Sequence, residues 1–133
     1  MKQHSKFDLS KYRIDKAKQT LKAAEELLNT NKYLDSINRS YYAIFHITRA
    51  LFAIDEFDTR KHSGVISYFN KNYVKTGLIE KDYSVIIMSA EKLRGRSDYD
   101  DFYIASREDA EKQCQNAKKF LKKLEDYISK LEK

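Results

Sequence analysis

No proline occurs in this chain of 133 residues, and glycine stands at only three positions, 64, 77 and 95. Compact β-sheet folds need many tight turns, and proline and glycine supply much of the backbone geometry of such turns. Long α-helices need neither residue, because both are poor helix formers. A chain of this size supports one hydrophobic core. The sequence therefore predicts an all-α protein with a single domain, residues 1–133.

Apolar residues recur at steps of three and four, which places them on one face of a helix. The pattern predicts five helices, at about 10–28, 33–54, 63–76, 80–94 and 106–131. Ser63 and Ser106 are the expected N-caps of the third and fifth helices, and Gly77 and Gly95 the expected stops of the third and fourth. The segment 96–105 is then a loop. The predicted fold is an up-and-down antiparallel helical bundle.

The last expected helix carries a seam of apolar residues at heptad spacing. Its members are Ala110, Cys114, Ala117, Leu121, Leu124, Ile128 and Leu131. Such a seam can close the protein's own bundle or pair with a helix of a partner. A small domain needs every apolar face that it has, which favours burial inside its own bundle.

Composition narrows the class of protein. The single cysteine, Cys114, cannot form an internal disulfide and fits a reducing compartment. No apolar run approaches the ~18 residues of a membrane span, so we expect a cytoplasmic protein without a membrane partner. Three histidines and one cysteine show no metal-ligand spacing, and we expect neither metal nor cofactor. The net charge of +6 favours nucleic acid only weakly, because acidic and basic residues are interleaved.

The second expected helix is largely apolar but carries one stripe of ionisable and aromatic residues. They are Asp35, Arg39, Tyr42, His46 and Arg49. Buried ionisable groups need partners, so this stripe either lines a groove or forms an internal network. In the structural interpretation, Arg39 pairs with Asp35 and His46 is a core histidine. In the functional one, His46 transfers a proton and an arginine binds a phosphate.

Two further clusters carry similar chemistry. His62 follows Arg60 and Lys61 at the start of the third expected helix, where it can bind an anion or face solvent. After the fourth expected helix come Arg94, Arg96, Asp98 and Tyr99, which suit a phosphate with a stacked base. In the structural alternative, a pair between Arg96 and Asp98 holds this loop on the bundle.

Several short motifs together resemble one protein family. They are the segment NRSYYAIFH at 38–46, the Arg-Ala-Leu at 49–51, the His-Ser-Gly at 62–64, the Val-Lys-Thr-Gly at 74–77, and Arg94 with the following Asp98 and Tyr99. This set resembles the small prokaryotic HEPN domains, in a branch of uncharacterised proteins. The resemblance extends over about residues 9–131, which would form the core of the domain.

The resemblance implies a helical bundle that forms a homodimer and is often encoded beside a minimal nucleotidyltransferase as a toxin and antitoxin pair. Many HEPN proteins are metal-independent ribonucleases, in which an arginine and a histidine from both subunits promote attack of the ribose 2′-hydroxyl. Arg39 and His46 match the spacing of that pair. In the family, the arginine and histidine motif usually lies later in the chain. The corresponding part of this sequence is near Arg94, where no histidine occurs. In addition, Thr48 stands where the family has a tyrosine.

We therefore expect a HEPN-type protein that binds RNA or a nucleotide phosphate, as the toxin-type partner of a nucleotidyltransferase and as a candidate endoribonuclease. Arg39 and His46 are the candidate catalytic residues. The candidate phosphate-binding or nucleotide-binding residues are Tyr42, Arg49, His62, Arg94, Arg96 and Tyr99. The alternative is a non-catalytic interaction module, in which the same stripe orders the dimer or the partner interface.

Overall fold

A computed structural model describes residues 5–132, and this part of the chain is all-α, as predicted. Its elements are α1 (Lys6–Asn29), α2 (Tyr33–Ile54), α3 (His62–Phe69), the π-helical segment η1 (Asn70–Val74), α4 (Lys81–Tyr99) and α5 (Arg107–Glu132). The five α-helices of the described residues confirm the predicted helical bundle. The long helices match the apolar periodicity that predicted them.

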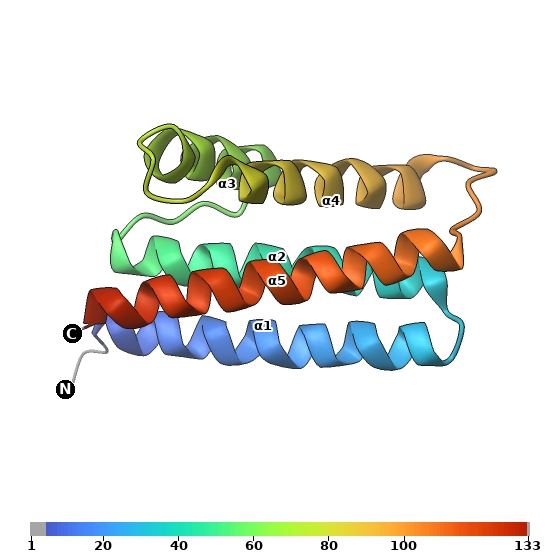
Figure 1. Ribbon diagram of the computed structural model, residues 1–133, viewed down its shortest axis with the longest axis horizontal. Helices are drawn as coiled ribbons and strands as arrows, with labels where there is room; N and C mark the ends of the chain where they lie inside the picture. Colours follow the sequence, from blue (N-terminus) through green and yellow to red (C-terminus); the bar gives the residue numbers. More distant parts are fainter. Residues whose placement is uncertain (1–4, 133) are drawn as a thin grey trace.

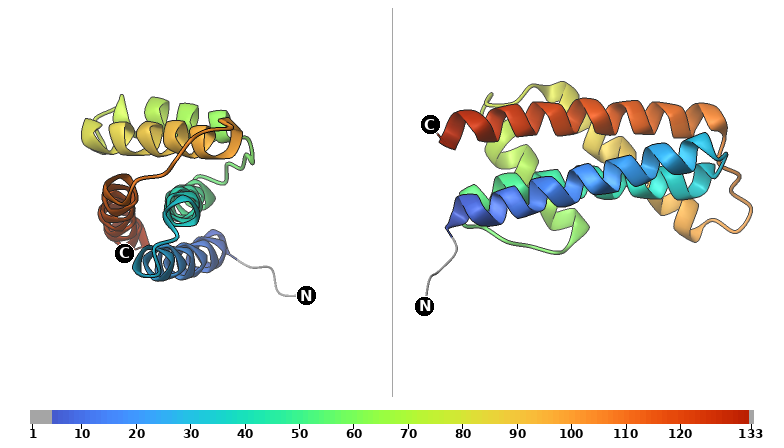
Figure 2. Two further views of the ribbon diagram at one scale, coloured as in Figure 1. Left: turned by 90° about the vertical axis from the view of Figure 1, so that its right-hand side faces the viewer. Right: turned by 90° about the horizontal axis from the view of Figure 1, so that it is seen from below.

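The helices form two layers. Helices α1, α2 and α5 lie side by side along the long axis of the molecule, and α3 and α4 lie across them as a second layer (Figures 1 and 2). The chain reverses between α1 and α2, so these two helices are antiparallel. Helix α5 begins at the same end as α2 and runs in the same direction, because the upper layer returns the chain to that end (Figure 1).

Helix α2 is central, because it contacts α1, α3, α4 and α5. It is therefore buried along most of its length, and Ile37, Ile44, Ile47 and Leu51 are at most 1% exposed. Each such side chain contributes roughly 1.5 to 3 kcal/mol when it leaves water. Little of the surface of α2 is accessible to solvent, so its polar residues are confined to one narrow face.

The seam of α5 is buried in the protein's own bundle, as favoured above. Ala110, Cys114, Ala117, Leu121, Leu124 and Ile128 belong to the buried residues of the helix. Leu131 is the exception, at 41% exposed. No helix within residues 5–132 is long and apolar enough to span a membrane.

The ends of three helices differ from their predicted positions. Helix α1 begins at residue 6, because Ser5 and Asp8 exchange side-chain and backbone hydrogen bonds of 3.1 Å in a capping box. Helix α3 begins at His62 after Lys61, so the prediction of Ser63 as its cap was wrong. Helix α4 continues through Gly95 to Tyr99, so the predicted stop at Gly95 was wrong as well.

Two other end signals were right. Gly77 has a φ of 82° in the turn that follows η1, which is a conformation that favours glycine. The hydroxyl of Ser106 accepts a hydrogen bond of 3.0 Å from the backbone N–H of Asp109 at the start of α5.

Candidate functional site

The polar stripe of α2 lies at the boundary between the protein and solvent. Tyr42, His46 and Arg49 are half-buried, and Arg39 is exposed. The Arg39 guanidinium lies 5.6 Å from the centre of the Tyr42 ring, and the rings of Tyr42 and His46 lie 6.2 Å apart. No ion pair between Asp35 and Arg39 is found in the described chain, so this part of the structural interpretation was wrong.

His46 lies in a strongly positive environment. Burial is the largest influence on its pKa, followed by the charges of Lys16, Arg49, Arg39 and Arg13. Together they lower the pKa of His46 to about 4. The imidazole is therefore neutral at pH 7, and it can accept a proton or a hydrogen bond. Sequence reasoning missed Arg13 and Lys16, because only the packing of α1 against α2 brings them to this face.

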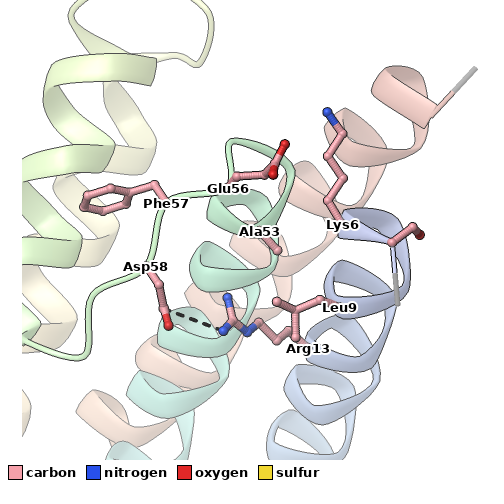
Figure 3. Close-up of a pocket in the computed structure, with 8 residues that line it drawn as sticks. Lys6, Leu9, Arg13, Ala53, Glu56, Phe57 and Asp58 are labelled. Carbon is pink, nitrogen blue, oxygen red and sulfur yellow. Dashed lines mark ion pairs between the residues drawn. The ribbon is translucent and has the colours of Figure 1, made fainter. Parts of the chain in front are cut away.

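The acid that balances these cations is Asp58, in the loop after α2. It pairs with Arg49 at 2.6 Å. It also pairs with Arg13 at 3.6 Å, the ion pair that the dashed line in Figure 3 marks. The hydrogen bond from Arg49 holds the pKa of Asp58 below its usual range. Neither Lys16 nor Arg39 has an acidic partner within residues 5–132. The face around His46 therefore carries more positive than negative charge.

A cleft of about 390 Å³ lies next to this face, between the start of α1 and the end of α2. Figure 3 shows Arg13 and Asp58 on one side of it, with Lys6 and Glu56 near its rim. Its basic and acidic groups are balanced in number, and neither His46 nor Arg39 lines it. The cleft therefore favours an anion less than the surface around His46 does.

His62 joins the stripe from the start of α3. Its ring lies 4.9 Å from that of Phe45 and 6.0 Å from that of Tyr42, and its Nδ1 lies 2.5 Å from the hydroxyl of Tyr41. Burial and Glu91 raise the pKa of Tyr41, while burial and then Arg94 lower the pKa of His62. Both groups are thus neutral at pH 7. The Tyr41 hydroxyl and Nδ1 of His62 form a hydrogen bond, and Glu91 is a second hydrogen-bond partner of the same hydroxyl.

Arg94 of α4 packs against Tyr41 of α2, but its guanidinium already forms ion pairs. Its side chain lies 5.0 Å from the centre of the Tyr41 ring, and the residue is only 7% exposed. It donates to Asp98 at 2.7 Å and to Glu91 at 3.1 Å. The guanidinium therefore supports Tyr41 and has little capacity left for a phosphate.

Arg96 and Tyr99 lie apart from this cluster. Arg96 pairs with Asp100 at 3.5 Å and lies 5.1 Å from the centre of the Tyr103 ring. The suggested pair between Arg96 and Asp98 was wrong, because residues two apart on a helix point to different sides. Tyr99 is 78% exposed. These two candidate residues are on α4, and within the described chain they form no hydrogen bond, ion pair or ring contact with the stripe on α2.

The structure thus brings five of the candidate residues onto one surface, which we name the α2 face: Arg39, Tyr42, His46, Arg49 and His62. Within the described residues, no group of three or more His, Cys, Asp or Glu side chains could hold a metal ion. The chemistry available on the α2 face is that of two neutral histidines, His46 and His62, and of the Arg39 guanidinium, which has no acidic partner in the described chain. This set suits an anion that carries hydrogen-bond acceptors.

Comparison with known proteins agrees with the resemblance. The HEPN domain family matches residues 10–127 of this chain. A protein of Methanocaldococcus jannaschii named "Putative toxin MJ0142" is 33% identical over 115 residues, 86% of this chain and 78% of that protein. A second one, "Putative toxin MJ0605", is 40% identical over 86 residues, 65% of this chain and 64% of that protein. A "UPF0332 protein" of Thermotoga maritima is 30% identical over 118 residues, 89% of this chain and 84% of that protein. With a match over most of its length, this chain belongs to the HEPN domain family.

Proposed function

We propose that this protein is a toxin-type HEPN protein that binds single-stranded RNA through the α2 face. The observation that carries the proposal is the surplus of positive charge around His46, where Lys16 and Arg39 lack acidic partners in the described chain. A phosphodiester supplies the missing negative charge. Half-buried Tyr42 offers a ring on which a base can stack.

The same groups support cleavage of the bound RNA. Neutral His46 accepts the proton of a ribose 2′-hydroxyl, and the 2′-oxygen attacks the neighbouring phosphorus. The bond to the 5′-oxygen breaks, that oxygen takes a proton from water, and the hydroxide that remains takes the proton back from His46. The products are a 2′,3′-cyclic phosphate and a 5′-hydroxyl. Arg39 stabilises the added negative charge of the transition state.

A homodimer supports this chemistry. Arg39 and His46 are seven positions apart, so their backbones are separated by about 10 Å along α2. Both side chains lean towards the N-terminus of α2, so the lean does not bring them closer together. An arginine and a histidine from two copies meet at one phosphate more easily than the pair within one copy. Light scattering of the purified protein at micromolar concentration tests the dimer, and a monomer mass contradicts it.

The decisive experiment measures binding and cleavage of a labelled RNA separately. We expect His46→Ala to bind RNA like the wild type but to lose cleavage, with unchanged helical content by circular dichroism. Arg39→Gln weakens both. Arg107→Gln is the matched control, because Arg107 is exposed on α5 and pairs with Glu111 at 2.7 Å. Cleavage is expected to persist in EDTA and to weaken as salt rises.

The possible results separate the two functions considered above. Cleavage that depends on Arg39 and His46 supports the ribonuclease. Salt-sensitive binding that needs Arg39, without any cleavage, leaves a non-catalytic RNA-binding module. A protein that binds no RNA leaves only an interaction role.

We also propose a minimal nucleotidyltransferase as the protein partner. Two relatives carry the word toxin in their names, and a toxin requires an antitoxin. Co-expression with a nucleotidyltransferase reading frame encoded beside this gene, followed by purification through a tag on one chain only, tests this proposal. A stoichiometric complex supports the pair, and recovery of the tagged chain alone contradicts it.

A further inference from the structure

A second basic surface lies in the upper layer of the fold, away from the α2 face. A shallow groove of about 740 Å³ runs between the end of α3, η1 and the start of α4. Three lysines line it: Lys71 and Lys75 from η1 and the residue after it, and Lys81 from the first turn of α4. None of the residues of the α2 face belongs to its lining.

The charge of this groove is not balanced by acids. All three lysines are exposed, and none of them forms an ion pair within residues 5–132. Two acids lie near them in the sequence, but neither lines the groove. Glu80 pairs instead with Lys123 of α5 at 2.9 Å, and Asp82 is exposed.

The polar lining of the groove is held in place by contacts between its two walls. The hydroxyl of Ser84, a residue only 8% exposed on α4, donates a hydrogen bond of 2.6 Å to the side-chain oxygen of Asn70. Asn70 opens the π-helical segment, and this segment carries Lys71. Interruptions of this type are rare in proteins and are frequent at functional sites.

We propose that this groove is a second contact site for RNA, which binds phosphodiester groups of the backbone. The inference rests on the proposed function. Lysines act as point charges without the planar fork of arginine, so they follow a backbone and do not read bases. Helix α3 connects the two sites, with His62 at its start. Lys71 follows nine residues later, about 13 Å along the helix axis, a distance that one RNA strand can bridge.

The test measures the affinity of a fluorescein-labelled oligouridine of 20 nucleotides by anisotropy over a series of salt concentrations. The variant is Lys71→Gln with Lys75→Gln. The matched control is Lys118→Gln with Lys122→Gln, which removes the same charge at the same spacing from the exposed side of α5. We expect the first variant to bind several-fold more weakly and its salt slope to fall by about 1.4, the value for two phosphate contacts on a single strand. The control stays close to the wild type.

A second measurement locates the contact. In the wild type, the oligouridine is expected to shift the backbone amide resonances of Ser84 and Lys81, and in the lysine variant these shifts are reduced. Inorganic phosphate at the same phosphate concentration serves as the comparison ligand. Equal shifts with inorganic phosphate would indicate a site for a free anion and would overturn the assignment to RNA.

Failure of this inference and failure of the proposed function give different results. If the wild type does not bind oligouridine, both the proposed function and the second RNA site are contradicted. If it binds and the Lys71 and Lys75 variant binds equally well, only the second site falls, and the groove belongs to another partner such as an acidic protein. If both lysine variants weaken binding equally, the effect is one of net charge, and the second site falls again. Circular dichroism confirms that each variant is folded.

Discussion

The hydroxyl of Tyr41 lies 2.5 Å from Nδ1 of His62, across 21 positions of the sequence. This contact joins α2 to the first residue of α3. The phenol and the imidazole are both neutral at pH 7, so the direction of this hydrogen bond and the tautomer of His62 depend on each other. A core residue thus orients a residue of the α2 face, and Arg94 packs over the same tyrosine ring.

Tyr41→Phe is expected to shift the pKa of His62, and the sign of the shift identifies the donor. Removal of a phenol that donates to Nδ1 makes protonation of the imidazole easier and raises this pKa, whereas removal of a phenol that accepts from Nδ1–H lowers it. Stability is expected to fall by about 1 kcal/mol through the lost buried hydrogen bond. An NMR titration of His62 and its nitrogen shifts, which report the tautomer, provide the measurement. Tyr42→Phe is the control, because the Tyr42 hydroxyl has no hydrogen bond in the described chain, and its His62 titration should match the wild type.

His46 is expected to make folding stability depend on pH between about 4 and 6.5. Its pKa in the folded protein is about 4, below the ordinary value of 6.5, so the unfolded chain binds more protons in this window. Stability therefore rises with pH across the window and levels off above it. Urea unfolding at several pH values should show a smaller dependence for His46→Gln. Identical profiles for the two proteins would show that the positive environment of His46 is not present in solution.

A bound phosphate counteracts the lowering of the pKa of His46. Negative charge beside His46 favours the protonated ring, so saturating oligouridine is expected to raise the pKa of His46. The measurement is an NMR titration of His46 with and without oligouridine. A constant pKa for His46 would place the RNA elsewhere.

Arg94→Met is expected to destabilise the protein by about 1.5 kcal/mol, because Glu91 and Asp98 lose their shared cation but stay partly exposed to water. Arg96→Met is the matched substitution on the same helix. Its side chain is 56% exposed and its only ion pair in the described chain, with Asp100, spans 3.5 Å, so the expected cost is below about 0.5 kcal/mol. Thermal or urea unfolding measures both. Equal costs would contradict the structural role assigned to Arg94.

Local signals predicted the long helices well, and they failed where a contact depends on the packing of distant segments. The limits of α2 were right because its apolar stripe is continuous and the polar residues at 29–32 and 55–61 bound it. The bond between Tyr41 and His62 could not be predicted, because it depends on how α3 crosses α2. The same holds for Arg13 and Lys16, which belong to α1 and appeared in its sequence as ordinary surface residues.

The π-helical segment and the end of α4 show a second limit. Apolar spacing predicted one short helix as far as Gly77, but it gives no signal for the wider turn at Asn70–Val74. For α4, Gly95 was predicted to end the helix. Pairs four residues apart, Arg94 with Asp98 and Arg96 with Asp100, outweigh that signal and extend the helix past Gly95.

Gly95→Ala is therefore expected to stabilise the protein, although a stop signal would predict the opposite. Gly95 is helical, and a Cβ added there would meet no atom within 4 Å. Alanine loses less backbone entropy than glycine in a helix, which gives a gain of about 0.5 to 1 kcal/mol. Gly77→Ala is the contrasting substitution, because its φ of +82° strains any residue with a side chain, and it should destabilise the protein even though space is open there. Urea unfolding of both variants compares the two glycines directly. A loss of stability in Gly95→Ala would show that α4 ends at this glycine, and the ion pairs of Asp98 and Asp100 would then not form as described.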